Sequence, residues 1–256
     1  MALTLGCHAV RVLTRQELTA ALAARQGLVE RWNIAPAEAI RRLTPLQGQH
    51  PPAPYVALAA RLHDFAKRDL EHAIDQRHVV KTTIMRRTLH LAAAADLPAY
   101  AQLARQARMR TWRKTYPQLD EHGATTELAE WLKTPRTNAE IRERVTRLGV
   151  ADDAWTPIAF ARTLLPLVQL PPAGHYRDAR KPRFAVDPRP LPEPQDAAQL
   201  VLTRYLEAFG PASRRDVAAW AGVAQRDFDH AAVREEALRT ARFLAPQHGR
   251  HDVRFE

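Results

Sequence analysis

The sequence of 256 residues contains a single cysteine, Cys7, and only nine glycines. One cysteine cannot form an internal disulfide, and it excludes zinc sites built from several thiolates. Scarce glycine beside abundant alanine favours helices, because alanine has the highest helix propensity and glycine one of the lowest. No apolar run reaches the roughly 20 residues of a membrane-spanning helix, and the first residues lack the pattern of a signal peptide. We therefore expect a mainly helical cytoplasmic protein without a membrane segment.

Positive charge is the main excess in the composition. There are 38 Lys and Arg against 28 Asp and Glu, which gives a net charge of +10 and a pI near 10.4. Residues 1–110 hold twice as many basic as acidic side chains, whereas residues 195–256 hold equal numbers. Clustered basic side chains release condensed counterions from nucleic acid, so a polyanion is the expected partner.

Helix signals recur along the chain. Thr14 and Glu17 form a capping-box pattern before a helix over 15–28, and Pro36 begins a second helix that ends near Thr44. Residues 125–149 and 200–222 each predict a helix, a turn and a second helix, the latter capped by Ser213. Asp96 is expected to cap a further helix.

Short strand pairs follow these helices. Hairpins are expected near residues 79–93, 167–186 and 242–256, and one continuous large sheet would contradict that expectation. A helix-turn-helix followed by a hairpin is a winged helix. The sequence therefore predicts tandem winged-helix units at 1–118, 119–192 and 193–256, the last two joined by a proline-rich linker over 187–196. Helix pairs of an ordinary bundle are the alternative.

Four segments carry a resemblance to a known family: LQGQHPPAPYVALAARL, MRRTLHLAAAAD, LVQLPPAGHY and RYLEAFGPASRRDVAAWAGV. Together they resemble the bacterial winged-helix DNA glycosylases of the AlkZ and YcaQ type, and the match covers nearly the whole chain. Those proteins are tandem winged helices with a C-terminal β domain. They excise alkylated bases, and some unhook interstrand crosslinks. The resemblance implies a Gln-x-Gln motif, here Gln47, Gly48 and Gln49, in which the YcaQ branch has Asp for the second Gln.

The chain departs from the family pattern at three points. Arg87 stands where the family usually has glycine, and Gly48 stands where a small apolar residue is common. Neither change removes a side chain that the chemistry needs. The chain also ends in the expected third wing, so the family's C-terminal β domain is expected to be missing, as in a truncated form or a fragment.

The two glutamines are the candidate catalytic residues. An amide does not titrate, but its oxygen can accept from a water and orient that water toward the sugar. A purine alkylated at N7 or N3 is cationic and leaves without much protonation, so a strong general acid or base is not required. Gln47 and Gln49 are therefore assigned to positioning the nucleophilic water, with two polar turn residues as the alternative.

Other side chains are candidates for DNA contact. His90 either reaches the DNA or is a satisfied core histidine, and no functional role is assigned to His50. Lys81 is a poor lyase nucleophile, because nothing in the sequence lowers its pKa. The candidates for contact with phosphates are Arg86, Arg87, His90, Arg105, Arg108, Arg110, Arg113, Lys114, His175, Tyr176, Arg177, Arg180, Lys181 and Arg183. Tyr176 is a wedge beside a lesion or packs on its own hairpin.

The sequence thus predicts a monofunctional DNA glycosylase that acts on alkylated purines in double-stranded DNA. No cofactor or metal is expected, and the protein is expected to be a monomer that associates with the nucleoid when bound to DNA. Two other functions stay open: a winged-helix transcription regulator without catalysis, and an accessory factor that has lost activity. Release of free alkylated base would separate the three.

Overall fold

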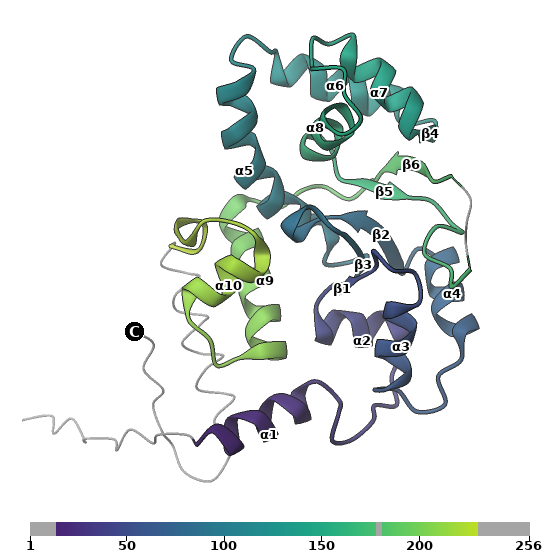
Figure 1. Ribbon diagram of the computed structural model, residues 1–256, viewed down its shortest axis with the longest axis vertical. Coiled ribbons are helices and arrows are strands. Elements are labelled where there is room, and N and C mark those ends of the chain that lie inside the picture. Colours follow the sequence, from purple (N-terminus) through teal and green to yellow (C-terminus); the bar gives the residue numbers. More distant parts are fainter. Residues whose placement is uncertain (1–13, 178–180, 230–256) are drawn as a thin grey trace, which may run out of the picture.

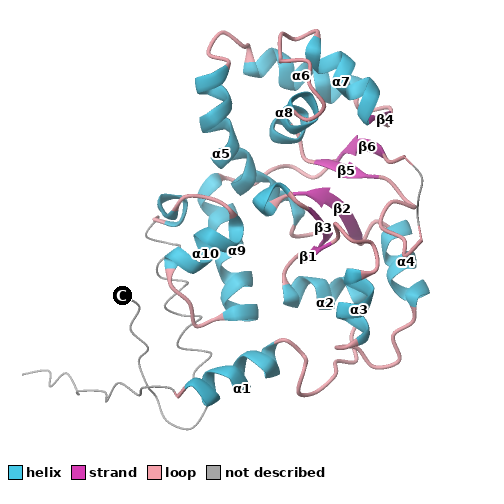
Figure 2. Cartoon of the chain, in the orientation of Figure 1, coloured by secondary structure: helices cyan, strands magenta, loops and turns pink. Residues whose placement is uncertain are grey.

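The computed structural model describes residues 14–177 and 181–229, and the described chain is mainly helical around one antiparallel sheet (Figure 1; Figure 2). Among these residues, no helix is both long and apolar enough to cross a membrane. The expected third hairpin, near 242–256, lies outside the described residues.

The first half of the chain alternates short helices with the central strands. Its elements are α1 (Arg15–Arg25), α2 (Pro36–Leu43), β1 (Leu46–Gln47), α3 (Ala53–Ala59), α4 (Lys67–Asp75), β2 (Val79–Thr83), the 3₁₀ turn η1 (Met85–Arg87), β3 (Leu89–Ala93) and α5 (Leu97–Thr115). Helix α1 begins with the predicted capping box of Thr14 and Glu17, and α2 begins at Pro36 as expected.

The second half holds both predicted helix pairs. Its elements are α6 (Glu121–Trp131), β4 (Arg136–Thr137), α7 (Asn138–Thr146), α8 (Thr156–Leu164), β5 (Leu167–Gln169), β6 (Arg183–Val186), α9 (Pro194–Phe209), α10 (Arg214–Ala221) and η2 (Gln225–Phe228). Thr137 and Ser213 close capping boxes at the starts of α7 and α10. The Ser213 cap predicted from the sequence is confirmed.

The strands form one six-stranded sheet in the order β1-β3-β2-β5-β6-β4. The predicted hairpins at 79–93 and 167–186 are present as β2–β3 and β5–β6. The expectation that they stay separate is wrong, because Lys81 and Thr82 of β2 pair with Gln169 and Val168 of β5. The Thr82 hydroxyl also donates to the Leu167 carbonyl oxygen at 2.6 Å. The β2–β5 pairing therefore unites segments about 85 residues apart.

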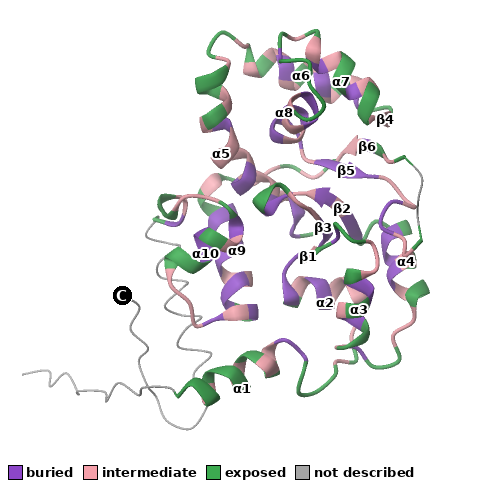
Figure 3. Ribbon diagram, viewed as in Figure 1, coloured by how far each residue is buried: buried purple, intermediate pink, exposed green. Residues whose placement is uncertain are grey.

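Three hydrophobic clusters surround the sheet, and its central strands are buried (Figure 3). Val79 and Leu91 pack with α2, α3 and α4, whereas the alternate residues Val80 and Ala92 pack with α5, α9 and α10. Phe184 packs in the cluster of α6, α7 and α8. Because strand side chains alternate between faces, β2 and β3 contribute to two cores at once.

Asp96 differs from its predicted role. It occupies the N-cap position of α5, but its side chain makes no cap hydrogen bond there. Its carboxylate instead accepts from Arg204 Nε of α9 at 2.7 Å, and both side chains are largely buried. The sequence shows a suitable capping residue but not the arginine 108 residues further on that competes for it.

Candidate functional site

The glutamine motif lies at one edge of the described sheet. Gln47 is the last residue of β1, the outermost strand, and it is exposed, as is Gln49. The Gly48 N–H between them is buried against β3 and donates to the Leu89 carbonyl oxygen at 2.8 Å. A Cβ added at Gly48 would lie 3.6 Å from the Leu91 backbone nitrogen, an ordinary contact. The edge position leaves both amides accessible from solvent.

The two amides differ in how they are held. Gln49 Oε1 accepts from the Leu89 N–H at 3.2 Å. The side-chain oxygen thus takes the place of a backbone carbonyl oxygen as the acceptor for this N–H of β3. An amide oxygen has two lone pairs, and its nitrogen carries two N–H donors. Gln49 therefore keeps one acceptor position and both donors, with its orientation fixed. Gln47 makes no hydrogen bond to any other described residue, so its amide is free to turn.

His90 lies directly across from Gln47 in the β1–β3 register, and Thr82 of β2 lies across from His90. Directly opposed residues of antiparallel strands share one face of the sheet, so Gln47, His90 and Thr82 form a row. The His90 ring is only 1% exposed, and its Nδ1 lies 2.9 Å from the Thr88 carbonyl oxygen. Since a carbonyl only accepts, this contact requires the proton on Nδ1. His90 is thus enclosed in the sheet and does not reach the solvent-exposed surface.

Burial lowers the pKa of His90 to about 4, against the opposing effect of the Thr88 carbonyl, and the nearby Arg86 charge lowers it further. The imidazole is therefore neutral near pH 7. Neither Gln47 nor Gln49 titrates, and no carboxylate stands in this row. Within the described ranges there is also no group of three or more His, Cys, Asp or Glu that could hold a metal ion. The row can orient a polar molecule, and its one titratable side chain, His90, is a weak base that is buried away from solvent.

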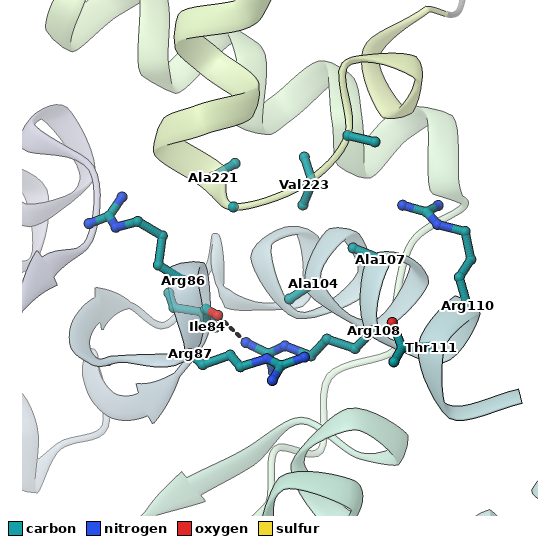
Figure 4. Close-up of a pocket in the computed structure, with 12 residues that line it drawn as sticks. Ile84, Arg86, Arg87, Ala104, Ala107, Arg108, Arg110, Thr111, Ala221 and Val223 are labelled. Atoms are coloured by element: carbon teal, nitrogen blue, oxygen red, sulfur yellow. Dashed lines mark hydrogen bonds between the residues drawn. The ribbon is translucent and has the colours of Figure 1, made fainter. Parts of the chain in front are cut away.

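A second cluster lies at the turn between β2 and β3. Arg86 and Arg87, both exposed, adopt φ angles of 48° and 58°. Left-handed backbone of this kind favours glycine, which is the residue that the resemblance implies at position 87. The two arginines border a hollow of about 390 Å³ that Arg108 and Arg110 of α5 also line (Figure 4).

The candidate cations on α5 are not equivalent. Arg105 and Arg113 both pair with Glu121, at 2.7 and 2.8 Å, and Arg110 forms a bidentate pair with Asp227, both contacts being 2.7 Å. Arg108 donates to the Ile84 carbonyl oxygen and pairs with no carboxylate among the described residues. Lys114 is exposed and makes no ion pair in the described chain. The sequence does not show these pairings, since the acids lie up to 117 residues away.

The segment between β5 and β6 is held against α3 and α4. His175 Nε2 lies 2.9 Å from an Asp75 carboxylate oxygen. The Tyr176 ring meets Tyr55 edge-on at 5.3 Å, and Lys67 Nζ lies 3.7 Å above it. Tyr176 thus packs on other elements, neither on its own hairpin nor as a free wedge.

The other candidates for phosphate contact between β5 and β6 lie near the two ends of this connection. Arg177, Lys181 and Arg183 are exposed, and Arg183 donates to the Pro135 carbonyl oxygen at 2.9 Å. Arg180 lies outside the described residues. The structure therefore gathers the glutamine motif and His90 at one place and the Arg86, Arg87, Arg108 and Arg110 set at another, and leaves the remaining candidates apart.

Comparison with known proteins bears on this arrangement. A family model described as DNA glycosylase AlkZ-like matches residues 40–253, which includes the glutamine motif, the sheet and all helices from α3 to α10. This chain belongs to the AlkZ-like DNA glycosylase family. The family expected from the sequence is thereby confirmed.

A solved structure of the AlkZ-like family has the same fold. The Streptomyces sahachiroi DNA glycosylase AlkZ is similar with a TM-score of 0.69 and 21% sequence identity, over 86% of this chain and 63% of that one. The chain thus spans less than two thirds of the length of that glycosylase. No sequence among the curated proteins matches. The likeness supports the fold, while the roles of individual residues rest on their own geometry.

Proposed function

We propose that this member of the AlkZ-like family is a monofunctional DNA glycosylase that hydrolyses the N-glycosidic bond of alkylated, cationic purines in double-stranded DNA. The observation that carries the proposal is the pair of exposed amides at the sheet edge, one of them fixed by the Leu89 N–H. Their exposure suits a bulky adduct or a crosslinked base, which does not fit a deep pocket. We extend the proposal to the unhooking of interstrand crosslinks on that ground.

The proposed chemistry needs a positioned water and no proton acceptor in the rate-limiting step. Gln49 offers its remaining lone pair, and Gln47 can turn its amide oxygen toward the same water. Both oxygens are dipoles that favour the oxocarbenium-like sugar as the bond to the cationic base breaks. His90, buried and neutral beside Gln47, supports the strand and stays out of the reaction.

Further parts of the proposal concern architecture and partners. We assign the chain to the Gln-x-Gln branch of the family and divide it into winged-helix units at 1–118, 119–192 and 193–256. The order α6, α7, α8 and then the β5–β6 hairpin supports the second unit. We take the protein to act as a monomer in the cytoplasm, on damaged duplex, without a cofactor.

Release of N7-methylguanine from a methylated duplex under single-turnover conditions tests the catalytic assignment. Gln47→Ala and Gln49→Ala should each lower the rate by roughly 10²-fold to 10³-fold, by analogy with other preorganised polar contacts. The two losses should be non-additive if both amides hold one water. Gln76→Ala, which changes an exposed glutamine just after α4, is the matched control and should react at the wild-type rate.

The pH profile gives a second reading of the same step. Because an amide does not titrate, the rate should show no acidic limb from either glutamine, whereas Gln49→Asp introduces a group with an ordinary pKa near 4 and should acquire one. If both alanine variants react at the wild-type rate, the two glutamines are polar turn residues without a catalytic role. Duplex binding without any base release, in the wild type as well, would favour a non-catalytic DNA-binding protein.

A further inference from the structure

The hollow between η1, the middle of α5 and the end of α10 combines small apolar walls with a basic rim (Figure 4). Its volume of about 390 Å³ lies within the range of ligand sites. Its walls include three small apolar side chains, those of Ala104, Ala107 and Ala221, and the Thr111 side chain adds a hydroxyl. No acidic side chain of the described chain lines it.

The four arginines at this hollow differ in how much charge they leave uncompensated. Asp227 neutralises Arg110 through two hydrogen bonds of 2.7 Å. Arg86 donates to the Trp220 carbonyl oxygen, which fixes its position but does not cancel its charge. Arg87 is exposed and makes no hydrogen bond or ion pair to another described residue. Arg87 and Arg108 converge in Figure 4.

Arg108 is the unusual member of the set. Its guanidinium is partly buried and bonds one neutral partner, the Ile84 carbonyl oxygen. Burial lowers the pKa of Arg108 to about 10, and the charges of Arg87 and Arg162 lower it further. A buried charge without an opposite charge is costly, and proteins rarely keep one without a counterion. An anion is the kind of ligand that would supply the opposite charge.

The turn that presents Arg87 is strained. Two consecutive arginines, Arg86 and Arg87, have φ angles of 48° and 58°, a conformation that costs free energy for any side chain with a Cβ. The end of α10 holds the turn in place. A Cβ at Gly222 would lie 3.0 Å from the Arg86 nitrogen, and Gly222 itself has a φ of 71°. The fold thus maintains an unfavourable backbone conformation at the position that places the Arg87 cation at the rim of the hollow.

From these observations we infer that the hollow is a binding site for a single phosphoryl group, held by Arg87 and Arg108, with Arg86 adding positive potential. Arginine suits this ligand, because its planar set of N–H donors matches phosphate oxygens bidentately. We assign the phosphoryl group to a backbone phosphodiester of DNA, an assignment that rests on the proposed function. Arg105 and Arg113 do not line the hollow, and Arg110, which does, is already neutralised by Asp227.

The Arg87→Gly variant tests the inference, because it removes a cation and relieves the backbone together. Arg77→Gly is a matched control: Arg77 is exposed, has a φ of 55° and does not line the hollow. Each substitution should leave the protein folded and raise Tm by roughly 2–4 °C. Affinity for undamaged duplex should fall about 10-fold in Arg87→Gly, the loss expected of one charge-assisted contact, and less than 2-fold in Arg77→Gly.

A second measurement identifies the source of the phosphoryl group. The nitrogen-15 NMR signals of the arginine Nε–H groups can be followed while inorganic phosphate replaces chloride at constant ionic strength. Phosphate should shift the Arg108 signal in the wild type, and should shift it less in Arg87→Gly. A second outcome is that phosphate perturbs Arg108 while Arg87→Gly binds duplex with wild-type affinity. That outcome would support the anion site and assign it to free phosphate esters. Equal loss of affinity in both variants, or no change in either measurement, would overturn the inference. Neither readout needs base release, so a failure of the glycosylase proposal stays distinguishable.

Discussion

At the scale of single residues, His90 shows how burial beside the glutamine motif fixes the protonation state of a histidine. Its Nδ1 proton is committed to the Thr88 carbonyl oxygen, and its ring is buried across from Gln47. Protonation would place a charge in the sheet interior, which is why the pKa falls to about 4 from an ordinary value near 6.5.

This depressed pKa makes stability depend on pH. Between pH 4 and 6.5 the unfolded chain binds a proton at His90 that the folded chain does not, so the contribution is present above pH 6.5 and lost as the pH falls to 4. For a pKa that is lowered from an ordinary 6.5 to about 4, the full loss amounts to roughly 3 kcal/mol. Urea unfolding of the wild type and His90→Gln at pH 7 and pH 4.5 measures it.

The His90→Gln variant is the control, because the other histidines are the same in both proteins. The wild type should lose more unfolding free energy than His90→Gln between these two pH values. A constant difference between the two proteins across that range would show that His90 is not held neutral by burial.

At the scale of elements, the contact of α9 with the start of α5 includes a buried ion pair beside its hydrophobic core. Arg204 donates to Asp96 at 2.7 Å, with side chains 14% and 8% exposed, and also reaches Glu207 on its own helix at 3.1 Å. Removing one partner of a buried pair leaves an uncompensated charge, which is strongly destabilising.

Arg204→Ala should therefore lower the free energy of unfolding by about 3 kcal/mol or more in a urea titration near pH 7. Arg142→Ala is the comparison, since Arg142 and Asp152 form a pair at 2.7 Å with both side chains about half exposed. That variant should lose much less unfolding free energy, because water screens the exposed charges. Similar losses in the two variants would contradict the assignment of the Asp96 pair as buried and structural.

The elements themselves were well predicted by local sequence. The capping boxes at Thr14 and Ser213 and the proline at position 36 mark helix starts that the structure confirms, because these signals act within one turn of a helix. Asp96 fails as a cap because a distant arginine satisfies its carboxylate instead.

At the scale of the whole molecule, the excess of positive charge determines how the protein should respond to salt. Each phosphate neutralised on duplex DNA contributes about −0.9 to the slope of log K against log salt concentration. We expect affinity for undamaged duplex to fall steeply as salt rises, with a slope of several units, measurable by fluorescence anisotropy over a range of NaCl concentrations. An affinity independent of salt would contradict binding through phosphates.

The pairing of cations with acids limits which side chains can produce this slope. Among the candidates on α5, Arg105, Arg110 and Arg113 have carboxylate partners, whereas Arg108 and Lys114 have none within residues 14–177 and 181–229. The count of 38 Lys and Arg in the chain therefore overstates the number of cations free to neutralise phosphate.

The sequence by itself determined the helical class, most helix starts, the strands of both described hairpins and the family, because these depend on local propensity and on contiguous motifs. Only the tertiary structure decided that the hairpins join through β2 and β5, that Asp96 bonds Arg204, and that Arg108 is partly buried with no acidic partner in the described part of the chain. Strand partners and ion pairs connect residues about 85 to 117 positions apart. No local pattern encodes such contacts, since they arise only when the packing of the cores brings the segments together.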